Sequence, residues 1–237
     1  MNYFIYILLA LLPSLIWLLF FLHKDTNPES NRMILKIFFY GMIIALPAAL
    51  IEMGIFELFG KLNLSPFLVK YLNIFIGVAL IEESLKYLVV RGKVISNPEF
   101  DEPLDIMLYM VIAALGFVAS ENILIFLSPK VFLLPLGETL GLAGFRFISA
   151  TFLHALCSGT IGFFLALSFF ESENKSKLLA LGLGIAVLLH GIYNFSIMEA
   201  EGNAQFIIPI IILIGLALFV SFGFKKVKKM RSVCEIN

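Results

Sequence analysis

The chain has 237 residues, of which 60% are hydrophobic and 14% are charged. Soluble domains are about half apolar and about a quarter charged. This composition, with a mean hydropathy of +0.99, therefore predicts a polytopic membrane protein. Lys and Arg together number 17, Asp and Glu also number 17, and the net charge is zero. That balance excludes a strongly basic nucleic-acid-binding protein and an acidic disordered tail, so we expect no nucleic-acid partner.

Apolar runs long enough to cross about 30 Å of hydrocarbon, which takes roughly twenty helical residues, predict about seven transmembrane helices. In chain order these runs are Tyr3–Leu22, Met33–Phe59, Phe67–Val90, Leu104–Leu127, Leu142–Phe170, Leu178–Met198 and Phe206–Phe224. The first run lacks a basic leader and a small-residue cleavage site, so we expect a retained helix rather than a signal peptide. The connections are short, which predicts a single membrane-embedded domain over residues 1–237. The predicted fold is an all-α, polytopic integral membrane helix bundle.

Positive charges are distributed unevenly between the two sets of connections. One set, together with the C-terminal tail, carries Lys24, Arg32, Arg91, Lys93, Lys175, Lys177, Lys225, Lys226, Lys228, Lys229 and Arg231, whereas the other carries Lys61, Lys70 and Lys130. Because Lys and Arg favour the cytoplasmic side, we expect the N-terminus outside and the C-terminus in the cytoplasm. Residues 225–237 then form a basic cytoplasmic tail that anchors to anionic headgroups of the lipid bilayer.

Polar residues inside the predicted spans are few and concentrate in four consecutive ones. An ionisable group at the membrane centre costs roughly 2.5–3.5 kcal/mol on insertion scales, so it persists mainly where it is paired and functional. The third span carries Glu82, Glu83 and Lys86, the fourth Glu121 and Asn122, the fifth Arg146 and His154, and the sixth His190 and Asn194. These side chains predict a hydrated cavity inside the bundle. The simpler alternative is a structural set of buried ion pairs.

Helical spacing places members of this group on common faces. Glu82 and Lys86 are four residues apart, as are His190 and Asn194, so each pair shares one side of its helix. For straight helices rising 1.5 Å per residue, Glu121 lies roughly 9 Å, His154 roughly 18 Å and Glu82 roughly 22 Å below the outer surface. These depths agree only if the third span starts later or is tilted.

Carboxylates and imidazoles in one cavity predict the activation of water. A Glu can act as general base with His as its partner and without a metal. Alternatively, two histidines and a carboxylate, here His154, His190 and Glu121, are a donor set that binds catalytic zinc and leaves a position for water. Motifs of rival hydrolases, such as HExxH and GxSxG, are missing from the sequence. We interpret Ser158, four residues after His154, as a packing hydroxyl.

Several motifs occur in a fixed order between Val78 and Phe195, each on its own predicted span. EESLK fits EExxK, GFVASEN fits GFxxxEN, Arg146 is followed eight residues later by His154, and HGIYN fits HxxxN. The stretch EFDEPLD precedes the fourth span. Each motif alone is weak, but the ordered set resembles the PrsW family of intramembrane proteases. That family is more distantly related to the prenyl-protein endopeptidases and the bacteriocin-immunity-type membrane proteases.

The resemblance implies a multi-pass protease of the bacterial plasma membrane. Its substrate would be a single-pass membrane protein such as an anti-sigma factor, cut first on the outer side (site 1) during a stress response. Carried over residue by residue, the implied catalytic residues are Glu82, Glu83, Glu121, His154 and His190, supported by Lys86, Asn122, Arg146 and Asn194. Zinc is a possible cofactor, and a metal-free mechanism stays open. The prenyl-protein endopeptidases carry His where this chain has Glu121.

Two other functions are compatible with the pattern. Intramembrane Glu, His and Lys side chains can also form the relay of a proton- or ion-coupled transporter. The absence of an internal sequence repeat argues against that class, since many transporters are built from repeats. A non-catalytic receptor or immunity protein is the third possibility. The complete set of candidate catalytic residues argues against it, because such a protein is free to lose them.

Overall fold

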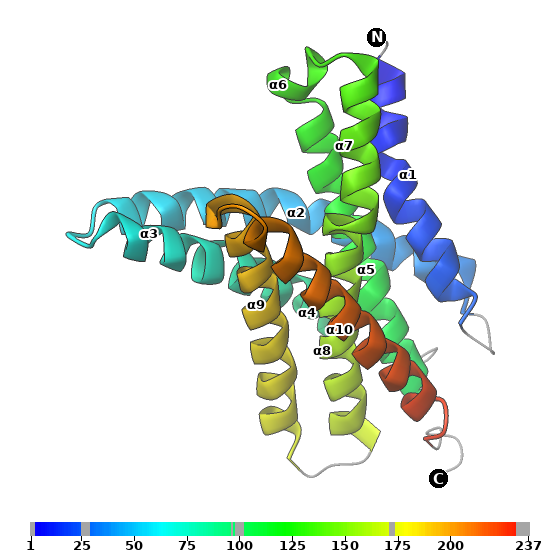
Figure 1. The fold of residues 1–237 in the computed structure, drawn as a ribbon. Helices are drawn as coiled ribbons and strands as arrows, with labels where there is room; N and C mark the ends of the chain where they lie inside the picture. Colours follow the sequence, from blue (N-terminus) through cyan, green and yellow to red (C-terminus); the bar gives the residue numbers. More distant parts are fainter. Residues whose placement is uncertain (1–2, 25–28, 96, 98–101, 171–173, 231–237) are drawn as a thin grey trace.

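The computed structural model describes residues 3–24, 29–95, 97, 102–170 and 174–230, and among these it contains helices and no strand. In chain order the helices are α1 Tyr3–Leu22, α2 Asn31–Gly60, α3 Pro66–Leu72, the π-helical η1 Asn73–Leu80, α4 Ile81–Lys93, α5 Pro103–Phe126, α6 Pro129–Phe132, α7 Leu136–Ile148, α8 Ala150–Phe170, α9 Lys175–Glu199 and α10 Ala204–Val227. The predicted all-α bundle is thereby confirmed (Figure 1).

Among the residues that the structure describes, six helical segments are long and apolar enough to cross a membrane, namely α1, α2, α5, the combined segment Leu136–Phe169, α9 and α10. The sequence predicts about seven, and the difference lies in the third predicted span, Phe67–Val90. That stretch is divided into α3, η1 and α4, of which the longest, α4, has 13 residues. The backbone keeps helical φ and ψ at both junctions, so α3, η1 and α4 form one helical path from Pro66 to Lys93, and η1 only widens its turns.

Helix α5 lies at the centre of the bundle, where it packs against α1, α2 and α8 (Figure 1). Every residue from Pro103 to Ala119 is buried. A helix that is apolar on all sides is covered on all sides, and this explains why α5 has no amphipathic pattern.

Helices α2 and α5 cross closely through two glycines. A Cβ atom at Gly41 would overlap the backbone carbonyl of Ala113, and a Cβ atom at Gly116 would overlap the carbonyl of Phe38. Small residues let membrane helices approach to backbone contact. The glycine of the GFVASEN motif thus has a packing role that is separate from the chemistry of the glutamate that follows it.

The fifth predicted span, Leu142–Phe170, is interrupted at Ser149, which has φ −116° and ψ −89°. The Ser149 hydroxyl donates to the carbonyl of Phe145 at 2.6 Å, and the indole N–H of Trp17 donates to the carbonyl of Phe147 at 2.9 Å. Carbonyls at a helix end lack intrahelical partners, and the Trp17 indole supplies one to Phe147. The Phe145 carbonyl also accepts from the backbone N–H of Ser149 at 3.0 Å. The interruption divides the element between Arg146 and His154.

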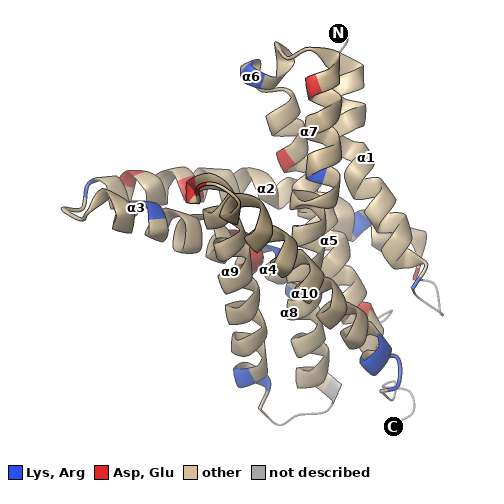
Figure 2. Ribbon diagram, in the orientation of Figure 1, with Lys and Arg blue, Asp and Glu red and all other residues tan. Residues whose placement is uncertain are grey.

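Helices α2 and α3 run side by side at a steep angle to α7 and α8 (Figure 1). The helical path to Glu82 begins at Pro66, one residue before the predicted start, so the tilt and not a later start accounts for the mismatch in depth. Basic residues gather at the beginning of α9 and at the end of α10, which lie at the same end of the bundle (Figure 2). The orientation across the membrane stays a prediction. Residues 231–237 of the predicted tail lie outside the described residues, as do residues 99–101 of the EFDEPLD stretch.

Replacing Gly41 or Gly116 with Ala is expected to destabilise the protein by about 1–3 kcal/mol, because the neighbouring backbone cannot yield to the added methyl group. Gly54→Ala, on the same helix as Gly41, is the matched control because nothing lies within 4 Å of its Cβ position. Its stability is expected to stay equal or rise slightly. Thermal unfolding of the detergent-solubilised protein measures the difference. Equal melting temperatures for Gly41→Ala and Gly54→Ala would contradict the close crossing.

Candidate active site

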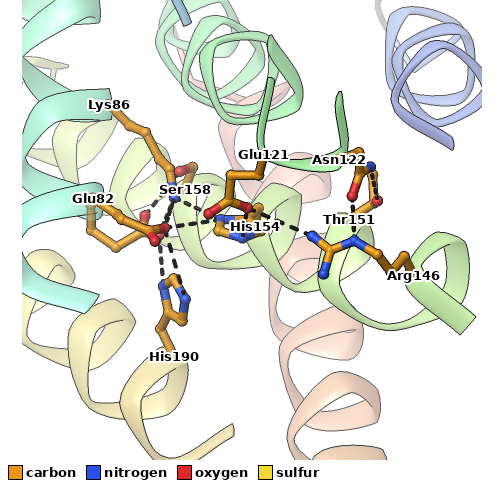
Figure 3. A network of polar contacts seen from close by, with 10 residues as sticks. Glu82, Lys86, Glu121, Asn122, Arg146, Thr151, His154, Ser158 and His190 are labelled. Carbon is orange, nitrogen blue, oxygen red and sulfur yellow. Dashed lines mark hydrogen bonds and ion pairs between the residues drawn. The ribbon is translucent and has the colours of Figure 1, made fainter. Parts of the chain in front are cut away.

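Four helices deliver polar side chains to one point in the interior (Figure 3). Helix α4 contributes Glu82, Glu83 and Lys86, α5 contributes Glu121 and Asn122, α8 contributes His154 and Ser158, and α9 contributes His190. The structure therefore brings together all five predicted catalytic residues. It also brings together three of the four predicted supporting residues, Lys86, Asn122 and Arg146.

Lys86 lies at the centre of this cluster and is completely buried. Its ammonium nitrogen is 3.1 Å from Oε2 of Glu82, 2.8 Å from Oε1 of Glu83 and 2.7 Å from Nδ1 of His154. The same nitrogen lies 4.4 Å from the centre of the Phe117 ring, on its face. A buried charge requires compensating partners, and Lys86 receives them from both α4 and α8.

These contacts allow the protonated nitrogen of His154 to be assigned. An ammonium group only donates hydrogen bonds, so Nδ1 of His154 accepts and Nε2 carries the proton. Nε2 then donates to Oε2 of Glu121, which lies 3.1 Å away. His154 is thus held between the Lys86 ammonium on one side and a carboxylate on the other.

His190 is oriented by Glu83. Nδ1 of His190 lies 3.0 Å from Oε1 of Glu83, while the second carboxylate oxygen accepts a bond from the Ser158 hydroxyl at 3.0 Å. A carboxylate that bonds one ring nitrogen fixes the orientation of the imidazole and leaves its other nitrogen available. That other nitrogen, Nε2, faces Oε2 of Glu82 at 4.0 Å. The rings of His154 and His190 meet edge to face with centres 4.9 Å apart.

Glu82, Glu83, His154 and His190 form a group with the composition of a metal site. Each offers one donor atom, all these atoms lie within 4.8 Å of one another, and all four residues are buried. Nitrogen and carboxylate oxygen are the donors of catalytic zinc sites, so the donor types fit such an ion. In this structure the Lys86 ammonium, 2.7–3.1 Å from three of the four residues, holds the cationic position among them. Glu121, predicted as the carboxylate donor, lies outside this group and contacts His154 instead.

A second polar chain leads away from the buried group. A guanidinium nitrogen of Arg146, Nη2, lies 3.8 Å from Oε2 of Glu121, and Nε of Arg146 donates to the side-chain oxygen of Asn122. Asn122 in turn donates to the Thr151 hydroxyl at 3.3 Å. The side chain of Glu121 is 25% exposed, whereas that of His154 is 5% exposed. Glu121 and Arg146 therefore mark the accessible edge of the site.

Asn194 is the one predicted residue that does not join the network. It is half-buried, one turn after His190, and its side chain makes no hydrogen bond with any residue that the structure describes. Conversely, Ser158, Thr151 and the ring of Phe117 contribute contacts that the sequence did not predict. The four-residue spacing between His154 and Ser158 is the sequence signal for the place of Ser158 in the cluster, because it puts both side chains on one face of α8.

Comparison with known proteins agrees with this geometry. The model of the "PrsW family intramembrane metalloprotease" matches residues 29–222. The chain belongs to the PrsW family. It is therefore a member of a family of membrane metalloproteases, and a multi-pass protein of the bacterial plasma membrane.

Three relatives named Protease PrsW match this chain over most of its length. The protein of Bacillus subtilis (strain 168) is 29% identical over 225 residues, which cover 93% of this chain and 93% of the relative. That of Oceanobacillus iheyensis is 28% identical over 205 residues, covering 85% and 87%, and that of Geobacillus kaustophilus is 29% identical over 182 residues, covering 77% and 74%. No solved structure matches the chain.

Replacing Lys86 with Met is expected to lower the stability of the protein by about 3–5 kcal/mol, because two buried carboxylates lose their shared cation. Thermal unfolding in detergent measures this loss. Lys61→Met is the control, since Lys61 pairs with Glu57 at 2.5 Å but both side chains are 70% exposed, and such pairs contribute little. Equal melting temperatures for the two variants would contradict the central role of Lys86.

Proposed function

We propose that the chain is an endopeptidase that hydrolyses a peptide bond of a single-pass membrane protein, with water activated at the Glu82, Glu83, His154 and His190 group. The observation that supports this proposal is the meeting of two carboxylates and two imidazoles, within 4.8 Å of one another, inside a bundle that crosses the membrane. Acid, base and cation-binding groups in one place are the requirements for attack of water on an amide.

The proposed cofactor is a zinc ion held by His154, His190 and Glu82, with Glu121 outside the donor group as the base. When bound, zinc supplies a Lewis acid that lowers the pKa of a bound water to about 7. The donor set and the family's description as metalloproteases favour this route over the metal-free one.

The remaining side chains have distinct proposed roles around that centre. Glu83 orients His190 through Nδ1, and Ser158 holds the second oxygen of Glu83. Lys86 neutralises the paired carboxylates. Glu121, at the accessible edge, accepts the proton of the attacking water, while Arg146 and Asn122 hold that edge in position.

The proposed substrate is an anti-sigma factor or a similar single-pass protein, cut first at a site on the outer side. The backbone groups of a transmembrane helix are bonded internally, so the scissile segment has to be extended when it reaches the site. The partial exposure of Glu121 and Arg146 supports entry from that edge. The proposal includes a single domain over residues 1–237, an external N-terminus and a basic cytoplasmic tail from residue 225.

Replacing His154 or His190 with Ala, or Glu83 or Glu121 with Gln, is expected to reduce peptide cleavage about 100-fold or more while expression stays normal. Cleavage of a single-pass substrate in proteoliposomes is the measurement. His23→Ala is the matched control because His23, the third histidine of the chain, is exposed beyond the end of α1.

Full cleavage by both histidine variants would refute the protease proposal. Proton flux into the same liposomes without any peptide hydrolysis would favour the transporter instead.

Metal removal tests the zinc route separately. Purified protein is expected to contain about one zinc per chain, and the double variant His154→Ala/His190→Ala is expected to contain none. Chelation is expected to abolish cleavage by the unaltered protein, and added zinc to restore it. Elemental analysis of the protein in detergent, paired with the cleavage assay, measures both. Undiminished cleavage by demonstrably metal-free protein would instead support the Glu/His mechanism.

A further inference from the structure

A large cavity lies between α1, α8 and α10, and none of its lining residues belongs to the active-site cluster. Its volume is about 690 Å³, which falls within the range of roughly 300–1,000 Å³ typical of small-molecule sites. The rings of Phe21 and Phe224 approach to 5.8 Å between α1 and α10. Both residues are buried, as is Leu156 of α8, so the cavity has a closed apolar wall.

The apolar part of this cavity is built from stacked aromatic rings. Trp17 stacks on Phe152 with ring centres 4.1 Å apart and on Phe147 with ring centres 5.4 Å apart. Its one polar group, the indole N–H, is already bonded to the carbonyl of Phe147. The surface that remains is hydrocarbon-like and held in place, which suits an acyl chain better than a polar ligand.

One end of the cavity is basic. Lys24 follows the end of α1, and Lys225 and Lys228 lie at the end of α10. All three are exposed, and within the described parts of the chain no carboxylate forms an ion pair with them. No acidic residue is found among the described residues that line the cavity. Figure 2 shows the basic residues at the end of α10.

We propose that this cavity binds an anionic phospholipid of the surrounding bilayer. The headgroup phosphate lies among Lys24, Lys225 and Lys228, and an acyl chain lies against Trp17 and Phe152. Basic pockets at the ends of membrane helices attract anionic headgroups, and hydrocarbon walls between helices accept the chains. A zwitterionic lipid has the same chains but no net charge to match three lysines, so the proposal commits to the anionic class.

The chain offers a built-in reporter for this site, because Trp17 is its only tryptophan. Phospholipids with brominated acyl chains quench a tryptophan that they contact. The full-length protein is titrated in nanodiscs with brominated phosphatidylglycerol or with brominated phosphatidylcholine. Phosphatidylglycerol is expected to quench Trp17 at a several-fold lower mole fraction.

The triple variant Lys24→Gln/Lys225→Gln/Lys228→Gln is expected to lose this preference, with binding weakened roughly tenfold or more, since each lysine near an anionic lipid contributes roughly a fivefold change in affinity. The control triple variant is Lys177→Gln/Lys226→Gln/Lys229→Gln. It removes the same charge from the same end of the bundle but from residues that do not line the cavity. The control is expected to retain the preference.

Equal quenching by the two lipids, or equal loss in the two triple variants, would overturn the proposal. Circular dichroism and the unquenched Trp17 emission establish that each variant is folded. If the triple variant does not fold, the single substitution Lys225→Gln is compared with Lys226→Gln in its place. A severalfold shift is then expected for Lys225→Gln alone. These outcomes do not depend on peptide cleavage, so they test the lipid site independently of the proposed protease function.

Discussion

The burial of the Lys86 ammonium between two carboxylates and an imidazole is the constraint on which the rest of the site depends. Lys86 links α4 to α8 through His154, and Glu83 links α4 to α9 through His190. Since an unpaired charge in the interior is costly, these helices are held at the distances that the contacts require. Lys86 thus positions His154 directly and His190 through Glu83.

The sequence predicts that these polar side chains converge, but not which of them contact one another. The spacing of Glu82, Lys86 and His190 within apolar runs was sufficient to place them inward, because an ionisable side chain in hydrocarbon needs a partner. The contact of Glu121 with His154 and that of Ser158 with Glu83 each join two helices. They depend on how those helices are tilted and rotated, which no local sequence spacing determines. Likewise, the apolar pattern does not indicate the π-helical turns of η1 within the third predicted span or the break at Ser149 within the fifth.

The site is divided into a closed part and an accessible part. Glu83, His190 and Ser158 are sealed from solvent and hold one another in fixed orientations. Glu121 and Arg146 lie at the partly exposed edge, next to the interruption between α7 and α8. The closed part is rigid, which keeps the donor atoms aligned. The partly exposed edge gives access to an extended chain. Helix α5 serves both parts, because it carries Glu121 and packs against α8.

The position of Lys86 on the same helix as Glu82 and Glu83 also affects how the protein is made. Transmembrane segments leave the translocon one after another, and α4 emerges before the helices that carry His154 and His190. The free-energy cost of removing two unpaired glutamates from water would oppose the insertion of such a segment into the lipid. Because Lys86 lies three and four residues from them on one face, α4 carries its own counter-ion into the lipid. The nascent chain can thus deliver acidic residues to the membrane interior before their final partners have been synthesised.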